Sequence, residues 1–471
     1  MHTIEQIFIN GEFVTPHGTE RFDLYNPATA QVIGQVRLAD EVDAERAIAA
    51  AKAAFPAWSQ TTKQERIAAL KRMHAAVVAR HDDLLEAVIE EYGAPASRSA
   101  WMARYPAEVI AQAIEALEAF EFVTSAGAAT VQMTPLGVAG LITPWNSDAG
   151  FICGKLAAAL AAGCTAVIKP SEMSALQTQI VTEALRDAAL PPGVFNIVTG
   201  RGETVGDTIS RHPDVAKISF TGSTNTGKAI LRNAAESFKR VTLELGGKSP
   251  TILLDDVDLA QAIPLVIQAG FMNSGQACVA GTRILVPYSR KAEIETALAQ
   301  AVAAVKSGDP RDSATEIGPM VSEKQWLRVQ GYIRKGIEEG ARLLAGGEGR
   351  PDGTRDGWFV RPTLFADVNN QMTVARDEIF GPVLCVIPYR DEAEAIAIAN
   401  DTEYGLSAMV LGGDADRARR VAQQIVSGRV LVNTLAHEPK APFGGFKHSG
   451  VGREMGEWGI RAFMEPRSVL G

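Results

Sequence analysis

The sequence is poor in cysteine, in long apolar runs and in clustered basic charge. Its 471 residues include only four cysteines. No Cys-x-x-Cys pair occurs, which argues against a disulfide framework or zinc ribbon and is typical of a reducing compartment. The 46 basic and 55 acidic residues leave a net charge of −9. Without a basic block, nucleic acid and anionic membranes are not expected partners.

The apolar segments are also too short for a membrane protein. The longest one near the middle, residues 156–163, is alanine-rich and cannot span a bilayer. Residues 1–14 have neither the basic nor the apolar region of a signal peptide. We therefore expect a cytoplasmic protein that binds small molecules and holds no metal.

Alternating strand and helix patterns follow a helical first third of the chain. At about 150 residues per domain, the length predicts about three units. Apolar periodicity predicts helices over residues 41–57, 63–92, 97–122 and 155–162. Strands and helices alternate over residues 137–237 and again over 249–433, which predicts two doubly wound parallel α/β units with a hinge near 243–247. The glycine-rich segment 346–358 predicts a surface loop.

Cys278 and Glu244 are the strongest candidates for covalent chemistry. A thiolate can add to a carbonyl carbon and form a thioester, and a carboxylate can activate the water that hydrolyses it. A free cysteine is more often a small buried hydrophobe, and that interpretation suits Cys153, Cys164 and Cys385, which lie in apolar runs. Glycines flank Cys278 and an amphipathic stretch ends just before it, so we expect Cys278 on a loop after a helix.

Polar or glycine-rich turns follow three successive strands of the first unit. Gly202 and Gly206 would let backbone approach a pyrophosphate, although ordinary turn glycines look the same. Ser223 could cap the next helix and offer its hydroxyl to phosphate. Lys169 and Glu172 could bind ribose hydroxyls, although such a pair is more often solvated. Because strand ends share one edge of a parallel sheet, the three turns together favour a dinucleotide cofactor.

Asn146 follows a further strand of the same unit, in the sequence Pro144-Trp145-Asn146. Its neutral amide could donate a hydrogen bond to a developing oxyanion without changing charge. Asparagine in this position also suits an ordinary turn. The local residues leave both interpretations open.

Seven short motifs occur in order along nearly the whole chain. They are Pro144-Trp145-Asn146, Lys169-Pro170-Ser171-Glu172, Phe220-Thr221-Gly222-Ser223-Thr224, Glu244-Leu245-Gly246-Gly247-Lys248, Gly275-Gln276-Ala277-Cys278, Glu378-Ile379-Phe380-Gly381-Pro382-Val383 and Pro442-Phe443-Gly444-Gly445-Phe446. In this order and at these separations the chain resembles the aldehyde dehydrogenase superfamily.

The resemblance implies an α/β architecture of three parts. These are a Rossmann-like nucleotide-binding domain of residues 1–121 and 134–243, a catalytic domain of 244–441, and a small β oligomerisation segment of 122–133 and 463–471, with 442–462 returning to the nucleotide-binding domain. Family members form dimers or tetramers, so a homo-oligomer is expected.

The resemblance also implies a reaction, NAD-dependent oxidation of an aldehyde to a carboxylic acid through a cysteine thiohemiacetal and thioester. Cys278 attacks the aldehyde, Asn146 and the Cys278 N–H hold the oxyanion, and Glu244 activates water. Lys155 and Glu454 pair in a proton relay.

Binding residues are implied at the matching positions. Those for the cofactor are Ile142, Trp145, Lys169, Ser171, Glu172, Gly202, Gly206, Phe220, Gly222, Ser223, Leu245, Gly246, Glu378 and Phe380. Those for the substrate are Phe151, Val279, His437 and Phe443. The Glu172 carboxylate near the ribose 2′-position disfavours a 2′-phosphate, so NAD is expected over NADP.

The chain departs from many relatives around the substrate entrance. Residues 147–150 and Gly154 stand where bulky residues are common, which predicts a wider and more polar entrance. The loop 435–440 carries both charge signs, and His437 in it is as readily a solvated residue as a substrate contact.

Three alternative functions stay open. In a CoA-acylating relative CoA takes the acyl group, but such relatives generally lack the base at Glu244. A cysteine hydrolase needs a histidine near Cys278, whereas His212 and His437 are distant in the sequence. A catalytically silent structural relative is disfavoured by the intact Cys278, Glu244 and Asn146.

Overall fold

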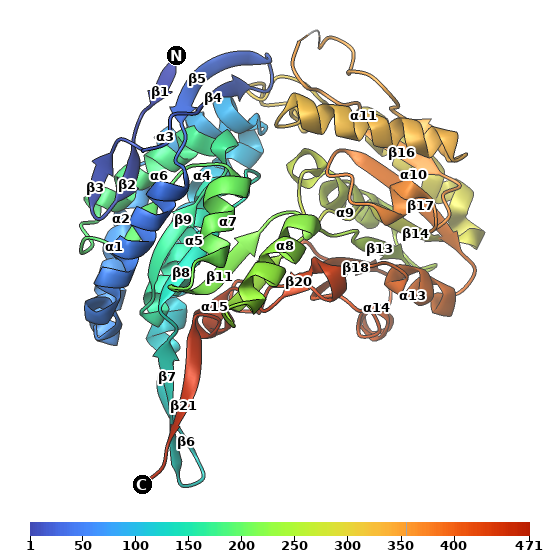
Figure 1. Cartoon of the computed structure of the whole chain (residues 1–471). Helices are drawn as coiled ribbons and strands as arrows, with labels where there is room; N and C mark the ends of the chain where they lie inside the picture. The colour runs from blue at the N-terminus through green and yellow to red at the C-terminus, as the bar shows by residue number, and fades with distance from the viewer. Residues whose placement is uncertain (355) are drawn as a thin grey trace.

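The structure is a computed structural model that describes residues 1–354 and 356–471. Residue 355, within the predicted surface loop 346–358, lies outside the described residues. Two large α/β units occupy the left and right of Figure 1, accompanied by two three-stranded sheets. None of the helices among the described residues has both the length and the apolarity needed to cross a bilayer. The predicted α/β class is confirmed.

The first large sheet has eight strands with a parallel centre. In spatial order they are β20 (Gly450–Val451), β12 (Arg240–Glu244), β11 (Val215–Thr221), β8 (Val138–Ile142), β9 (Thr165–Lys169), β10 (Phe195–Ile197), β2 (Ile7–Ile9) and β3 (Glu12–Val14). The strands from β12 to β10 run parallel, and antiparallel strands close both edges. Strand β20 pairs Gly450 with Glu244, so a segment from near the C terminus lies beside the end of β12.

Helices cover both faces of this sheet because its strands are apolar on both sides. The helices are α1 (Glu41–Ser59), α2 (Lys63–Val78), α3 (His81–Ala87), α4 (Ala96–Ala119), α5 (Asp148–Ala162), α6 (Ala175–Asp187), α7 (Asp207–Arg211), α8 (Thr224–Ala235) and α15 (Gly456–Arg461). Successive residues of a strand point to opposite faces. Accordingly Ala166 and Ile168 of β9 join the core with α2, α4, α5 and α6, while Val167 joins the core with α1 and α7.

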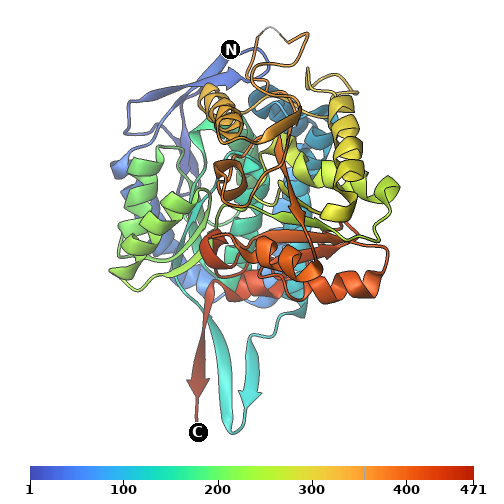
Figure 2. The same ribbon diagram turned by 90° about the vertical axis from the view of Figure 1, so that its right-hand side faces the viewer.

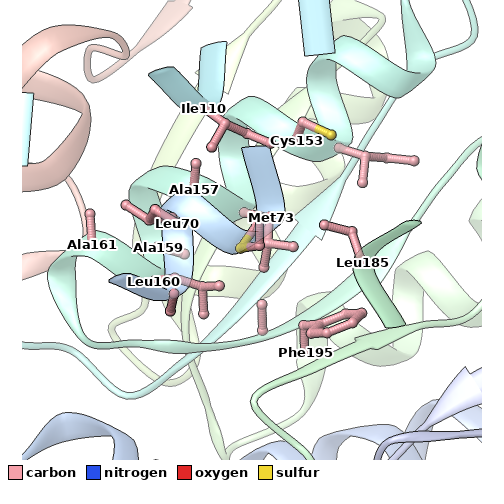
Figure 3. Close-up of a cluster of buried hydrophobic side chains, with 14 of the residues drawn as sticks. Leu70, Met73, Ile110, Cys153, Ala157, Ala159, Leu160, Ala161, Leu185 and Phe195 are labelled. Atoms are coloured by element: carbon pink, nitrogen blue, oxygen red, sulfur yellow. The ribbon is translucent and has the colours of Figure 1, made fainter. Parts of the chain in front are cut away.

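The centre of the larger core is built from small side chains (Figure 3). Ala157, Ala159 and Ala161 of α5 are fully buried, and Leu160 and Cys153 share the same cluster. Small residues let α5 pack closely against the sheet and against α4. The core position predicted for Cys153 is therefore observed.

The second large sheet has seven strands, all parallel except at one edge. In spatial order they are β15 (Arg342–Ala345), β16 (Thr363–Ala366), β17 (Val383–Tyr389), β14 (Arg283–Pro287), β13 (Pro250–Leu253), β18 (Ser407–Leu411) and β19 (Arg429–Val432). Its helices are α9 (Leu259–Gly270), α10 (Lys291–Ala304), α11 (Glu323–Glu338), α12 (Thr373–Arg376), α13 (Glu392–Asn400) and α14 (Ala415–Ala422). Ile284 and Val286 pack with α9 and α10, whereas Leu285 packs with α13 and α14.

The third sheet forms an arm that extends below the first unit in Figure 1. It consists of β21 (Met464–Val469), β7 (Ala129–Pro135) and β6 (Val123–Ala126), paired antiparallel in that order. Figure 2 shows the hairpin and the C-terminal strand projecting away from the body, with the C terminus at the tip. The fourth sheet joins β1 (His2–Ile4), β5 (Gln31–Arg37) and β4 (Arg21–Asn26) near the N terminus.

Two predicted helices differ from the observed ones. Segment 63–92 is divided into α2, α3 and the π-helical turn η1 (Val88–Tyr92), because Arg80 between α2 and α3 leaves the helical conformation. Helix α5 begins at Asp148 rather than at residue 155. Its first turn is fixed by tertiary contacts, in which Asp148 accepts hydrogen bonds from the Thr143 and Thr178 hydroxyls.

Candidate active site

Cys278 lies on the loop that joins the short turn η4 (Met272–Gly275) to β14, as the sequence predicts. It is half-buried, whereas Cys153, Cys164 and Cys385 are fully buried. Burial, together with the nearby carboxyl groups of Glu378 and Glu244, raises the pKa of the Cys278 thiol to about 12. The thiol is therefore protonated at neutral pH and needs a base to become a nucleophile.

The turn before Cys278 has a strained backbone. Asn273, Ser274 and Gly275 adopt positive φ angles of 56°, 58° and 75° in succession. A side chain on Gly275 would overlap the Gly381 backbone, so glycine is required for both conformation and space. The surrounding contacts hold the turn, since the Gly318 N–H donates to Ser274 Oγ at 3.0 Å. Strain of this kind is common at active sites.

Asn146 and the thiol loop are joined by hydrogen bonds between buried amides. Asn146 Nδ2 donates to the Gln276 carbonyl at 3.0 Å, and Asn273 Nδ2 donates to the Asn146 carbonyl at 3.0 Å. An asparagine amide has two N–H groups. One N–H of Asn146 is thus anchored two residues from Cys278, and the second is available to a ligand at the sulfur.

Glu244 ends β12 and is almost completely buried. Neither of its carboxyl oxygens has a hydrogen-bond partner in the described structure. Burial first, and the charge of Glu454 second, raise its pKa well above the ordinary value. A methyl group on Gly444 would lie 2.8 Å from Glu244 Oε1. The carboxyl group therefore has room only for a small partner such as water.

Lys155, which is buried, and Glu454, which is partly buried, form an ion pair, as the resemblance implies. Lys155 Nζ lies 2.5 Å from Glu454 Oε1 and donates a second hydrogen bond to Ser219 Oγ at 2.9 Å. Ser219 Oγ in turn donates to Glu454 Oε1 at 2.9 Å. Ser219 is a member of this cluster that the sequence analysis missed, because only the pairing of β11 with its neighbours brings it there.

The turn after β9 holds a cluster of charges. Lys169 Nζ lies 3.4 Å from Glu172 Oε2, and the Ser171 hydroxyl accepts from the Met173 N–H and caps the following turn. Arg201 lies 3.3 Å from the other oxygen of Glu172. The structure therefore brings Lys169 and Glu172 together and adds Arg201, a cation that the sequence analysis did not assign.

The glycine-rich turn η3 (Gly202–Gly206) and the start of α8 leave open space at the same edge. A methyl group placed on Gly202 would meet no atom within 4 Å, and one placed on Gly206 would meet only Lys169 Cδ, at 3.9 Å. Ser223 caps α8 by accepting from the Thr226 N–H at 3.3 Å. The space beside Gly222 is occupied by the Phe220 ring. This open cradle, next to helix N–H groups, suits a pyrophosphate.

The second unit contributes a carboxyl group to this region. Glu378 Oε1 accepts from the Gly247 N–H at 2.9 Å, and burial raises the pKa of Glu378 to about 7. A methyl group on Gly246 would lie 2.5 Å from Glu378 Oε2. The Phe380 and Trp145 rings meet edge to face at 5.5 Å. Ile142, at the end of β8, and Leu245 are buried nearby in one core.

The expected substrate residues differ in their burial. Val279 follows Cys278 and is half-buried, as are Phe151 on α5 and Phe443, which forms an isolated bridge with Glu454. His437 lies exposed on its loop. The four residues are therefore all at least partly exposed, and their contact with a substrate stays a prediction.

The prediction of a wider and more polar entrance at residues 147–150 is wrong. Ser147 is 9% exposed and Asp148 is fully buried. The space left by Gly150 is taken by the Tyr105 ring of α4, and Val109 lies 3.6 Å from a side chain placed on Gly154. The small residues of α5 are thus compensated by larger residues of α4. A sequence pattern does not show this because the two helices pack only in the folded chain.

These features define a class of protein, a two-unit α/β enzyme with a thiol, an amide donor and a buried carboxyl group beside a nucleotide-type cradle. A model of the aldehyde dehydrogenase family matches residues 13–469. The chain belongs to the aldehyde dehydrogenase family, and the resemblance seen in its motifs is confirmed.

Individual relatives match over the whole length. The chain is 44% identical over 473 residues to 3-succinoylsemialdehyde-pyridine dehydrogenase of a Pseudomonas species, covering 100% of this chain and 99% of that protein. A cysteine-to-alanine mutant of aldehyde dehydrogenase C from Pseudomonas syringae, solved with NAD+ and octanal, has a TM-score of 0.98 at 44% identity and covers 100% of this chain and 97% of that one. An aldehyde dehydrogenase of Mycobacterium tuberculosis complexed with NAD+ has a TM-score of 0.96 at 41% identity, with coverage of 99% and 98%.

Proposed function

We propose that this protein oxidises an aldehyde to its carboxylic acid with NAD as the hydride acceptor. The observation that carries the proposal is the convergence of the thiol and the carboxyl group. Glu244 ends a strand of the first sheet, and Gly247, three residues on, lies against the Cys278 carbonyl of the second unit. Thiol addition and thioester hydrolysis need these two groups at one carbon atom.

The chain's own residues supply the covalent steps. The Cys278 thiol loses its proton to solvent, the sulfur bonds to the carbonyl carbon, and the carbonyl oxygen takes the negative charge as the oxyanion of a thiohemiacetal. The free N–H of Asn146 and the Cys278 backbone N–H donate to that oxygen. NAD, when bound, accepts the hydride from the same carbon, which leaves a thioester on Cys278.

Glu244 then removes a proton from water, and the resulting hydroxide attacks the acyl carbon, so that the carbon–sulfur bond breaks and the carboxylic acid and the Cys278 thiolate are released. A raised pKa makes a carboxylate a stronger base once it is ionised. Lys155 and Glu454 lie close enough to Glu244 to influence its pKa, and we assign them the onward transfer of the proton.

The cofactor proposal rests on the residues at the carboxyl edge of the first sheet. The open cradle at Gly202 and the capped start of α8 suit the pyrophosphate. Lys169 and Glu172 suit the adenosine ribose, and Glu378 the second ribose. Because the Glu172 carboxylate repels a 2′-phosphate, NAD is the preferred form.

Domain roles and assembly follow the same proposal. Residues 1–121 and 134–243 hold the nucleotide, 244–441 carry the thiol, and 442–462 return to the first unit. Residues 122–133 and 463–471 form the arm through which copies associate as a dimer or tetramer. The four free cysteines support a reducing, cytoplasmic location.

The proposal is tested by incubating the protein with NAD and a panel of aldehydes while following NADH absorbance. We expect turnover that Cys278→Ala abolishes without loss of NAD binding, and a lower kcat/KM with NADP. Turnover that requires added CoA would instead indicate the acylating alternative. A folded protein with a titratable Cys278 thiol and no turnover would support the silent structural alternative.

A further inference from the structure

Arg429 is a half-buried cation without a carboxylate partner. It begins β19, and its Nε donates to Ser407 Oγ at 3.2 Å. No carboxyl oxygen lies within 4.0 Å of its guanidinium group in the described part of the chain. Cations removed from water are usually paired or hydrogen-bonded. The remaining N–H groups of Arg429 are therefore available to a ligand.

Backbone contacts place Arg429 next to the catalytic pair. Its N–H donates to the Leu406 carbonyl at 3.2 Å. Leu406 and the Cys278 carbonyl both pack against Gly247. On the other side, Gly428 packs against Gly444, which borders Glu244. The start of β19 is thus enclosed between the loop of the thiol and the segment that covers the base.

The guanidinium group faces the expected substrate side of the thiol. Its central carbon lies 5.8 Å from the centre of the Phe443 ring, within the range of a cation–π contact. Burial lowers the pKa of Arg429, and the Cys278 thiolate acts in the opposite direction. The pKa of His437 is lowered by desolvation and by the charge of Arg429. The field of Arg429 therefore reaches from the thiol to the His437 loop.

The carboxylates of Glu108 and Glu438, which also act on the pKa of His437, do not neutralise the charge of Arg429. Glu108 lies 3.7 Å from Arg104 on the exposed face of α4. Glu438 is exposed and accepts from the Lys440 N–H at 2.9 Å. Water and salt screen exposed charges more strongly than half-buried ones. Of these three charges, that of the half-buried Arg429 is therefore screened least, and it would act most strongly on a substrate that approaches Cys278.

We propose that Arg429 binds an anionic group at the far end of the aldehyde, so that the preferred substrates are short oxo acids whose chain carries an aldehyde and a carboxylate. This inference rests on the proposed function and specifies its substrate class. The Phe443 ring contacts the aliphatic part of the substrate, and Arg429 forms a charge-assisted hydrogen bond with the carboxylate.

The test compares 4-oxobutanoate with butanal, which has the same chain length without the charge. In the parent protein with NAD we expect a higher kcat/KM for 4-oxobutanoate. Arg429→Met should raise the KM for 4-oxobutanoate by about 10- to 100-fold, since hydrogen bonds to charged groups contribute about 1.5–3 kcal/mol. The KM for butanal should change by less than about 3-fold, whereas loss of the charge that acts on the Cys278 thiolate should alter kcat for both aldehydes alike. Arg429→Lys should recover part of the loss, and Arg72→Met on α2 is the matched control.

A binding measurement separates this inference from the proposed function. Calorimetry on Cys278→Ala without NAD should detect 4-oxobutanoate, and the added Arg429→Met change should remove that binding. If Arg429→Met changed the KM of both aldehydes equally, or changed neither KM, the inference would be overturned while aldehyde oxidation remained intact. If neither aldehyde is oxidised, the proposed function fails and the calorimetry alone decides whether Arg429 binds the anion.

Discussion

Cys278 carries its proton in the free protein because its surroundings disfavour a thiolate. Burial is the largest cause, followed by the carboxyl groups of Glu378 and Glu244, and together they raise its pKa to about 12. Nucleophilic attack therefore depends on proton removal at the moment of reaction.

The raised pKa predicts the pH dependence of alkylation. Below its pKa the thiolate fraction rises about tenfold per pH unit. The rate of iodoacetamide labelling at Cys278, followed by mass spectrometry, should therefore keep rising from about pH 7 to pH 10 without a plateau. Cys278→Ala gives the background from the three buried cysteines. A plateau near neutral pH would show that the sulfur is already ionised in the free protein.

At the residue scale, the sequence predicts groups that belong to motifs and misses those that arrive by packing. The pairing of Lys155 with Glu454 is expected from the resemblance and is observed. Lys169 and Glu172 are expected from the resemblance as ligands of one ribose, and in the structure they lie 3.4 Å apart. Tyr105 over Gly150 is not expected, because it depends on how α4 packs on α5. The position of the unpaired Arg429 likewise depends on the register of β19 beside β18.

Among the elements, the turn η4 concentrates backbone strain beside the thiol. Asn273 and Ser274 have positive φ, which costs of order 1–3 kcal/mol each and persists because surrounding contacts hold the turn, whereas Gly275 adopts its positive φ without strain. The boundary between α2 and α3 shows why such local features escape prediction. The apolar periodicity of residues 63–92 continues through Arg80, although the backbone there is not helical.

A pair of glycine substitutions tests the strain in η4. Gly275→Ala places a methyl group against the Gly381 backbone at a positive φ, so we expect a loss of at least about 2 kcal/mol of stability and of most activity. Gly331→Ala on α11 is the matched control. That position is helical and has open space for a methyl group, so the substitution should raise the stability by up to about 1 kcal/mol. The midpoint of thermal unfolding at a fixed heating rate measures both. A Gly275→Ala midpoint at or above that of the parent would refute the strain.

On the scale of the whole molecule, the arm of β6, β7 and β21 is the surface through which we propose that copies of the chain associate. Its two outer strands present free edges, which readily pair with another chain. Val123 and Val469 on these strands, and Leu470 directly after β21, are 57%, 45% and 76% exposed. The alternating patterns of the sequence predict the two α/β units. The combination of residues 122–133 with the C-terminal segment in one sheet is predicted only by the family resemblance.

Removing residues 467–471 tests the arm. All five are exposed in the single chain, so the fold should persist, with an unchanged circular dichroism spectrum. We expect the sedimentation mass to fall by at least one half, because the outer strand no longer pairs with a second copy. An unchanged mass would place the association of copies on another surface.

The most direct test of the central claim is to observe the acyl group on the sulfur. Glu244→Gln should release NADH in a single burst and then stop, since hydrolysis loses its base. Intact-mass spectrometry of the enzyme quenched after that burst should show one acyl group, located by peptide mapping on Cys278. Continued turnover of Glu244→Gln at the parent rate, or NADH release with no adduct on Cys278, would contradict the assignment of thiol and base.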